Sequence, residues 1–243
     1  MATSQKLGTA ELLYECAQQI GLKPAWVTPN GMFAFSVDGQ EKYVNFARSP
    51  LNTHNAISLA ENKYLTRLIL ARNNLPNIPF AWARTTEEAK AFLDEHGTII
   101  AKPNMGSGSR DIHIITDPAQ LEGLRIGGYI LEKYIPGKEF RYLILGNEVI
   151  AVHRSDYGTS VEETRPLERI SFPRNEWNPE LVSAALKTAQ MLELKFAAID
   201  FMIDDSGTAY ILEANARPGL KWFHAPTSGP AVDVARLFLE AVL

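Results

Sequence analysis

Hydrophobic and polar positions along the chain switch repeatedly between a helical spacing and a strand-like alternation. Apolar residues at helical spacing predict helices over residues 9–20, 57–73, 179–193 and 231–242. Short apolar runs bounded by turn residues predict strands, in chain order "AWVT", "FAFSV", "KYVNF", "IPFAW", "TIIAK", "DIHII", "YILEKY", "EFRYLIL" and "EVIAVH". Because hairpins are mixed with helical stretches, the pattern favours an α+β fold over a doubly wound sheet.

Local signals set several boundaries of these elements. Thr85 followed three residues later by Glu88 is typical of a capped helix start, and that helix should end at Gly97. Gly146-Asn147 predicts a tight turn between two strands. Residues 155–177 are polar, irregular and proline-bearing, which indicates a substrate-facing loop.

The stretch "AIDFMIDDSGTAYILEANARPG", residues 198–219, predicts a hairpin that carries unusual polar residues. A two-residue turn at Ser206-Gly207 would place Asp200 directly opposite Glu213, with Asn215 on the same face. Two opposed carboxylates repel each other, and a bound cation would remove that cost. An all-oxygen set suits Mg²⁺ or Mn²⁺.

A second interpretation of this hairpin needs no metal. One carboxylate would then form a salt bridge with Arg217 or Lys221, and the other would be solvated. The hairpin by itself leaves both interpretations open.

Two further segments carry candidate binding residues. Lys102 follows a buried apolar run and precedes the loop "NMGSGS", whose backbone N–H groups and lysine charge could meet phosphate, although an ordinary hairpin connection has the same composition. Glu132 and Glu139 flank "KYIPGK", a linker that could bind an adenine edge through its backbone and a ribose through a carboxylate. A solvated acidic pair is the alternative.

Arg141 and Arg154 alternate with apolar residues on predicted strands. An inward-pointing arginine on a sheet needs an anionic partner. Phosphate, a substrate carboxylate or Glu213 would each serve.

Composition limits the classes of partner. The chain has 243 residues, a formal net charge of −4 and a pI of about 5.8, so a bulk electrostatic partner such as nucleic acid or an anionic membrane is not indicated. The single cysteine, Cys16, falls on the apolar side of a helix, which predicts a core role and no intrachain disulfide. No apolar run approaches the ~20 residues of a membrane span, and we expect a cytoplasmic protein.

Four motifs in order resemble the ATP-grasp superfamily of carboxylate–amine ligases over residues 55–243. They are "AENKYLTRLILARNNLPNIP", "IIAKPNMGSGSRDI", "LEKYIPGKEFRYLIL" and the pair "AIDFMI" with "LEANARPGL". The likeness is nearest to cyanophycin synthetases, the ATP-grasp module of bifunctional glutathione synthetases and ribosomal-protein glutamylation ligases. It implies the ATP-grasp fold: a short N-terminal segment (1–55), a small subdomain (56–131) and a large subdomain (132–243).

The resemblance also implies roles for particular residues. Mg²⁺ or Mn²⁺ would be held by Asp200, Glu213 and Asn215, and ATP by the first motif, the loop and the linker. The nucleotide set is Lys63, Lys102, Ser107, Gly108, Glu132, Lys133, Tyr134, Ile135 and Glu139. The catalytic set is Arg154, Arg141 and Lys102, with Arg154 near the transferred phosphate.

The implied reaction joins a small-molecule or peptide acid to an amine through an acyl phosphate. Two alternatives remain: a ligase that forms ester or amide crosslinks on a precursor peptide, and a nucleotide-binding module without turnover. The sequence departs from the family in its short N-terminal segment, in Arg110 where the loop often has glycine, and in residues 155–177. These departures leave room for a second copy or a partner chain to complete the substrate site.

Overall fold

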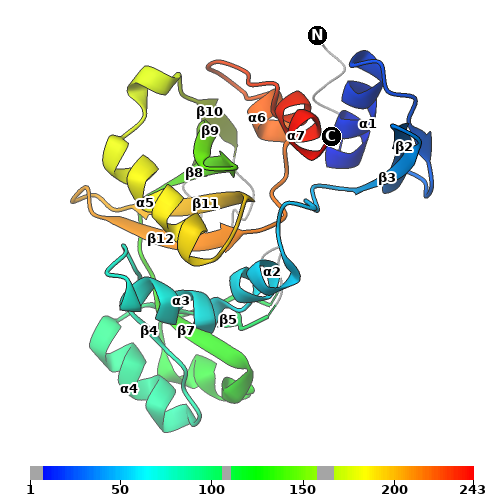
Figure 1. The fold of residues 1–243 in the computed structure, drawn as a ribbon. Coiled ribbons are helices and arrows are strands. Elements are labelled where there is room, and N and C mark those ends of the chain that lie inside the picture. The colour runs from blue at the N-terminus through cyan, green and yellow to red at the C-terminus, as the bar shows by residue number, and fades with distance from the viewer. Residues whose placement is uncertain (1–7, 106–110, 158–166) are drawn as a thin grey trace.

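A computed structural model describes residues 8–105, 111–157 and 167–243. Three sheets, each antiparallel, are combined with helices, so the predicted α+β class is confirmed. Figure 1 shows the four-stranded sheet (the small sheet) with α4 (Thr86–His96) at one end of the molecule and the five-stranded sheet with α5 (Pro179–Met191) in the middle. The N-terminal elements lie beside α6 (Lys221–His224) and α7 (Val234–Val242).

The helices fall close to the predicted ranges. They are α1 (Thr9–Gln19), α2 (His54–Glu61), α3 (Lys63–Arg72), α4 (Thr86–His96), α5 (Pro179–Met191), α6 (Lys221–His224) and α7 (Val234–Val242), with short 3₁₀ turns η2 (Pro118–Leu121), η3 (Ile126–Gly128) and η4 (Arg174–Glu176).

The strands form sheets in the orders β1-β2-β3, β10-β9-β8-β11-β12 and β4-β7-β5-β6. Their bounds are β1 (Ala25–Trp26), β2 (Met32–Val37), β3 (Gln40–Asn45), β4 (Phe80–Ala81), β5 (Ile99–Pro103), β6 (His113–Ile115), β7 (Tyr129–Lys133), β8 (Lys138–Leu145), β9 (Glu148–Asp156), β10 (Glu168–Ser171), β11 (Phe196–Ile203) and β12 (Ala209–Asn215).

The five-stranded sheet has two differently covered faces. On one face, side chains such as Tyr142, Ile199 and Phe201 pack against α2, α3 and α5 in a continuous apolar core. On the other face, Leu143, Ala151 and the following apolar positions pack against α1, α6 and α7. This second core covers only part of its face, and the remaining part carries the polar residues of the site.

Cys16 lies in the second core, as its place on the helix predicts. Burial and the nearby Asp233 raise the pKa of its thiol to about 11, so the thiol stays protonated at neutral pH. A nucleophilic role is therefore disfavoured.

The predicted helix over 57–73 is instead two helices. Asn62 ends α2 and caps α3, with its Oδ1 accepting a hydrogen bond from Leu65 N at 3.0 Å. Asparagine favours caps over helix interiors because its side chain competes for backbone groups. Leu65, expected on the apolar face, is exposed.

The predicted two-residue turn of the C-terminal hairpin is wrong, yet the pairing of its acids is confirmed. Ile203 pairs with Ala209, so the loop spans 204–208, and Asp204 Oδ1 accepts bonds from Ser206 N and Thr208 N. A β-bulge beyond Phe201 then shifts the register by one residue and restores the pair Asp200–Glu213.

Residues 155–177 are less irregular than predicted. The end of β9, the whole of β10 and η4 fall within this range, and residues 158–166 lie outside the described part of the chain. Helix α6 was not predicted, since four residues are too few for helical periodicity to show.

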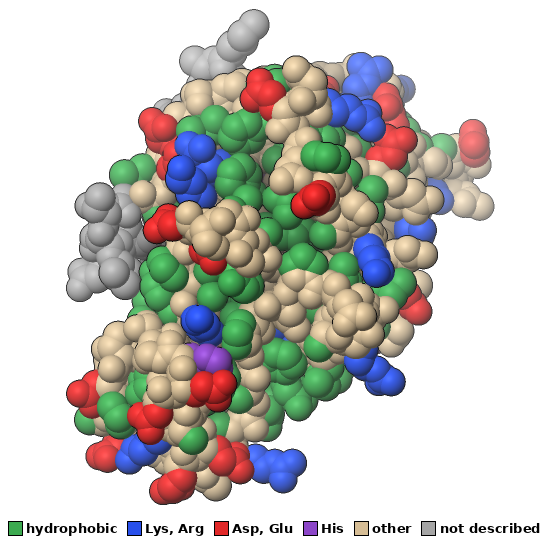
Figure 2. Space-filling view, turned by 90° about the vertical axis from the view of Figure 1, so that its left-hand side faces the viewer, with side chains coloured by type: hydrophobic (Ala, Val, Ile, Leu, Met, Phe, Trp, Pro, Cys, Tyr) green, Lys and Arg blue, Asp and Glu red, His purple; other side chains and the backbone are tan. Residues whose placement is uncertain are grey.

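Acidic and basic side chains are mixed on the face seen in Figure 2, with no extended basic surface among the described residues there. Within the described ranges, no helix combines the length and the apolar character that crossing a bilayer requires.

Candidate functional site

A row of charged side chains crosses the part of the five-stranded sheet that the second core does not cover. Glu213 on β12 pairs with Asp200 on β11, which pairs with Arg141 on β8. Directly opposed residues in a sheet project to the same face, so three ionisable groups meet on three neighbouring strands. The sequence prediction that Asp200 and Glu213 converge is therefore confirmed.

Arg141 is the cation that pairs with Asp200. Its Nε and Nη2 each donate to one carboxylate oxygen of Asp200 at 2.6 Å, a bidentate geometry. The partners expected from the sequence do not take part, because Arg217 pairs with Glu61 and Lys221 lies over the Trp222 ring.

Glu213 lies next to the paired Asp200 and is half-buried. Burial and the negative charge of Asp200 raise the pKa of Glu213, so keeping this carboxylate ionised costs free energy in the folded protein. Lys63, Lys102 and Arg141 act in the opposite direction on the same carboxyl. Burial lowers the pKa of Lys63, and Glu213 is the main neighbour that supports its charged form.

Asn215, the third predicted metal ligand, lies two residues beyond Glu213 on β12. Its Oδ1 accepts a hydrogen bond from Arg217 N at 2.9 Å, which leaves a second lone pair on that oxygen. Among the described residues, no three Asp, Glu, His or Cys side chains gather as a metal site. The predicted set contains only two such residues, so a cation there would need oxygen ligands from a bound phosphate or water.

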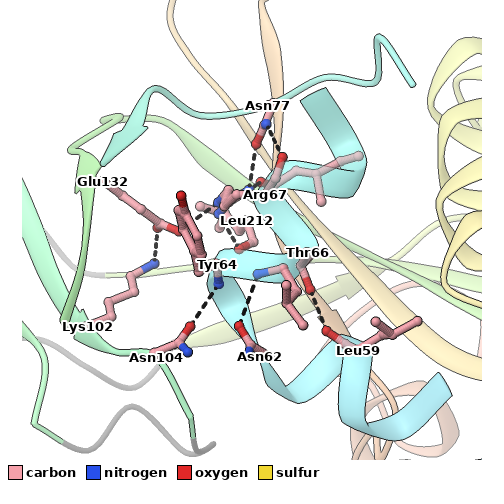
Figure 3. A network of polar contacts seen from close by, with 12 residues as sticks. Leu59, Asn62, Tyr64, Thr66, Arg67, Asn77, Lys102, Asn104, Glu132 and Leu212 are labelled. Carbon is pink, nitrogen blue, oxygen red and sulfur yellow. Dashed lines mark hydrogen bonds and ion pairs between the residues drawn. The ribbon is translucent and has the colours of Figure 1, made fainter. Parts of the chain in front are cut away.

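A fully buried arginine, which the sequence interpretation missed, connects the two halves of the site. Arg67 on α3 is 2% exposed, and its Nε donates to Glu132 Oε1 at 2.7 Å. Its Nη1 and Nη2 donate to the carbonyl oxygens of Ile211 and Leu212 at 2.5 and 2.7 Å. Figure 3 shows Arg67 between Glu132 and the backbone of β12.

These carbonyls belong to the β-bulge that sets the register of Glu213. Without the bulge, the pairing Phe201–Ile211 would continue as Asp200 opposite Leu212. Glu213 would then project to the opposite face, since a one-residue slip inverts a strand. Arg67 therefore stabilises the backbone geometry that brings the two carboxylates together.

Lys102 and Lys63 lie on the small-sheet side of the site. Lys102 on β5 donates to Glu132 Oε2 at 2.8 Å. Helix α3 begins against the residue that follows β5, because Lys63 N donates to Asn104 O at 3.0 Å. Tyr64 N donates to Asn104 Oδ1 at 2.9 Å (Figure 3). The start of α3 thus brings Lys63 beside the strand that carries Lys102.

The linker from β7 to β8 has one end fixed by the small sheet. Lys133 N and Tyr134 N donate to Pro79 O and Thr98 O, both at 2.9 Å. Within the described ranges, no acceptor receives the N–H of Ile135, which is a buried residue. Glu139, the predicted ribose contact, accepts a hydrogen bond from the Tyr157 hydroxyl at 2.6 Å.

Arg154 does not join the site. It pairs with Phe140, whose side chain packs against the core on the α5 face, so Arg154 projects to the opposite side of the sheet from Arg141. Its guanidinium binds Asp156 on the same strand at 2.6 and 2.7 Å. Ser107 and Gly108 lie outside the described residues.

The Glu132 ion pairs should make stability depend on acid pH. Burial opposes ionisation of Glu132, but Arg67 and Lys102 outweigh it and lower its pKa from 4.5 to about 2. The stabilisation is fully present above pH 4.5 and is lost as pH falls toward 2, on the order of 3 kcal/mol. In the Glu132→Gln protein, the free energy of unfolding should no longer fall by this amount between pH 4.5 and 2. Urea unfolding at several pH values in that range measures it.

The matched control is Glu122→Gln, an exposed carboxylate whose Oε1 lies 3.7 Å from Lys90 Nζ. We expect it to keep the acid dependence of the unmodified protein. If Glu132→Gln also keeps that dependence, the ion pairs of Glu132 do not stabilise the fold.

The chain is similar in sequence to known proteins. The ATP-grasp domain family matches residues 60–220. Tetrahydromethanopterin:alpha-L-glutamate ligase of Methanocaldococcus jannaschii is 25% identical over 220 residues, covering 83% of this chain and 72% of that protein.

Solved structures have the same fold. A bifunctional glutathione synthetase from Pasteurella multocida superimposes with a TM-score of 0.71 at 14% identity, covering 98% of this chain and 44% of that one. The ATP-grasp ligase PsnB, complexed with a minimal precursor, Mg and ADP, gives 0.62 at 19% identity, with coverages of 79% and 62%.

The chain belongs to the ATP-grasp family. The curated relative named above is an ATP-dependent ligase that forms a C–N bond. The predicted family and fold are confirmed. The chain spans 44% of that glutathione synthetase and 62% of PsnB, which is less than two thirds of either protein.

Proposed function

We propose that this protein is an ATP-dependent carboxylate–amine ligase, with nucleotide bound between the small sheet and the face of the five-stranded sheet that carries Asp200. The observation that carries the proposal is the row Glu213–Asp200–Arg141 facing Lys63. Two opposed carboxylates with nearby lysines suit a site where a divalent ion and phosphates meet.

The binding roles follow from this placement. Lys63 and Lys102 neutralise phosphate charge, and the N–H of Ile135, which has no acceptor within the described ranges, donates to an adenine edge. Glu139 binds the ribose. Asp200, Glu213 and Asn215 hold Mg²⁺, which when bound offsets negative charge on the phosphates. The donors fit, since all three residues supply oxygen and the raised pKa of Glu213 reflects a shortage of positive charge there.

The chemistry needs no covalent nucleophile on the protein. A carboxylate oxygen of the acid attacks the γ-phosphorus of ATP, the bond to the β–γ bridging oxygen breaks, and ADP leaves. The amine then attacks the acyl phosphate, phosphate leaves, and the amine loses a proton. Lys63, Lys102 and Arg141 stabilise charge on the transferred group, while Arg154 lies on the wrong face to do so.

The subdomain limits also belong to this proposal: an N-terminal segment over 1–55, a small subdomain over 56–131 and a large one over 132–243. Nucleotide would lie where the last two meet, beside Lys102 and the Glu132–Arg67 pair.

The test is product analysis by mass spectrometry. The protein is incubated with ATP, Mg²⁺ and a pool of amino acids and short peptides, with EDTA as the control. We expect ADP, phosphate and a product equal to two substrates less one water, all absent with EDTA. A product formed within one peptide would indicate precursor crosslinking instead. Nucleotide binding without ADP formation would contradict the ligase proposal.

A further inference from the structure

A second polar cluster lies on β9 and β10, and none of its residues is among those proposed to bind the nucleotide. It contains His153, Ser155 and Arg169. His153 and Ser155 are 1% and 2% exposed. The Nδ1 of His153, the Oγ of Ser155 and the Nε of Arg169 are all buried, and none has a hydrogen-bond partner among the described residues. Leaving a buried polar group unpaired costs ~1–3 kcal/mol, so three such atoms together indicate a missing ligand.

The three side chains share the face of the sheet that carries Asp200. His153 is paired with Arg141, and Ser155 is paired with both Glu139 and Arg169. Alternation along β9 puts residues two apart on the same side. The unpaired atoms therefore lie beside the proposed active site and continue the row of its charged groups.

Helix α6 covers this cluster on its outer side. The Phe223 ring packs 4.6 Å from the His153 ring, measured between ring centres. The Arg169 guanidinium carbon lies 5.0 Å, and Lys221 Nζ 4.6 Å, from the centre of the Trp222 ring. Two cations on one indole place positive charge at the edge of the cluster.

The nearby acids compensate the charge of Arg169 only in part. Asp200 is paired with Arg141 through both of its oxygens, each of which keeps a lone pair. Glu139, which also accepts a bond from the neutral Tyr157 hydroxyl, supports the charge of Arg169. Burial and the like charge of Arg141 lower the pKa of Arg169. A hydroxyl, a guanidinium N–H and an imidazole nitrogen are together a donor set for a carboxylate.

We propose that Arg169, Ser155 and His153 form a subsite for a second carboxylate of the substrate, remote from the one that is activated. The proposal rests on the ligase function above and names its substrate class, a dicarboxylic amino acid. His153 and Ser155 on β9 lie two strand spacings, about 10 Å, from Asp200 on β11. Arg169 on β10 lies three spacings away, about 14 Å between backbones, and its long side chain covers part of that distance. One acidic substrate could therefore present its reacting carboxylate near Asp200 and its other carboxylate to Arg169.

The subsite can be tested without knowing the full substrate. Calorimetric binding is measured with L-glutamate and L-aspartate against L-glutamine and L-asparagine, with and without Mg²⁺ and a non-hydrolysable ATP analogue. Each amide has nearly the shape of its acid but lacks the second charge. We expect the acids to bind at least tenfold more tightly than the amides.

Arg169→Gln should remove this discrimination by weakening the acids at least tenfold, with the affinity for the nucleotide analogue unchanged within threefold. Ser155→Ala should weaken the acids by a smaller factor. The matched control is Arg174→Gln, a nearby arginine that is 76% exposed and lies 5.8 Å from the Trp177 ring centre. It should leave both affinities unchanged.

Equal binding of acids and amides by the unmodified protein would overturn the subsite, as would acid binding that survives in Arg169→Gln. Loss of nucleotide and acid binding together in Arg169→Gln would show a structural role instead. Failure of the ligase proposal has a different signature: the unmodified protein would not bind the nucleotide analogue in a Mg²⁺-dependent way.

Discussion

Glu213→Gln is expected to lower ATP-dependent product formation at least about a hundredfold while leaving the fold intact or more stable. A glutamine cannot supply the negative charge that a divalent ion needs. In other metal sites, removing a residue that only orients a metal ligand already lowers metal affinity or activity about 10- to 100-fold. Burial and Asp200 raise the pKa of Glu213 in the folded protein, so its ionised form opposes folding at neutral pH. Removing that charge should raise the unfolding midpoint.

ADP release and urea unfolding, measured on the same preparation, separate the two effects. Asp205→Asn is the matched control, because Asp205 is exposed in the loop of the same hairpin. It should change neither quantity. A Glu213→Gln protein with unchanged Mg²⁺-dependent turnover would refute the metal assignment. Asp200→Asn is a weaker test, since it also removes the partner of the partly buried Arg141.

Arg67→Met is expected to destabilise the protein by about 3–5 kcal/mol, the cost of breaking a buried ion pair by removing one partner. The substitution leaves Glu132 with Lys102 alone and leaves the carbonyls of Ile211 and Leu212 without this donor. Because those carbonyls form the bulge that orients Glu213, the affinity for Mg²⁺–ATP should fall as well.

Arg72→Met is the control on the same helix, since Arg72 is exposed at its last turn. Arg67→Lys keeps the charge but not the planar fork, so it should fall between Arg67→Met and the unmodified protein. Urea unfolding and calorimetric titration with the Mg²⁺–ATP analogue measure both effects. Unchanged nucleotide affinity in an Arg67→Met protein that is destabilised would mean that Arg67 supports the fold without positioning Glu213.

Much of the fold could be predicted from local pattern. Strand alternation and Gly146-Asn147 predicted the hairpin of β8 and β9, and Leu145 does pair with Glu148 across that turn. Thr85 accepts the predicted bond from Glu88 N at 3.2 Å. The failures also have local causes. One asparagine, Asn62, divides a periodic stretch in two, because a capping side chain can interrupt a helix without changing the apolar pattern.

The site could be predicted in part. Asp200 and Glu213 face each other as expected, although by a different route: the turn is longer than predicted and the bulge compensates for it. Arg154 matched a family position, yet alternation along β9 places it on the α5 face. Its neighbour in sequence, His153, occupies the site face instead. The strand register was needed to tell these two apart.

The sequence by itself determined the elements, the approach of two carboxylates in one hairpin and membership of the ATP-grasp family, because these depend on spacings within short segments. Tertiary structure alone decided which cation meets which acid. Arg67 binds carbonyls 144 and 145 positions away, and Arg141 binds an aspartate 59 positions away. These contacts depend on how the sheets and helices pack together, and local sequence periodicity does not predict that packing.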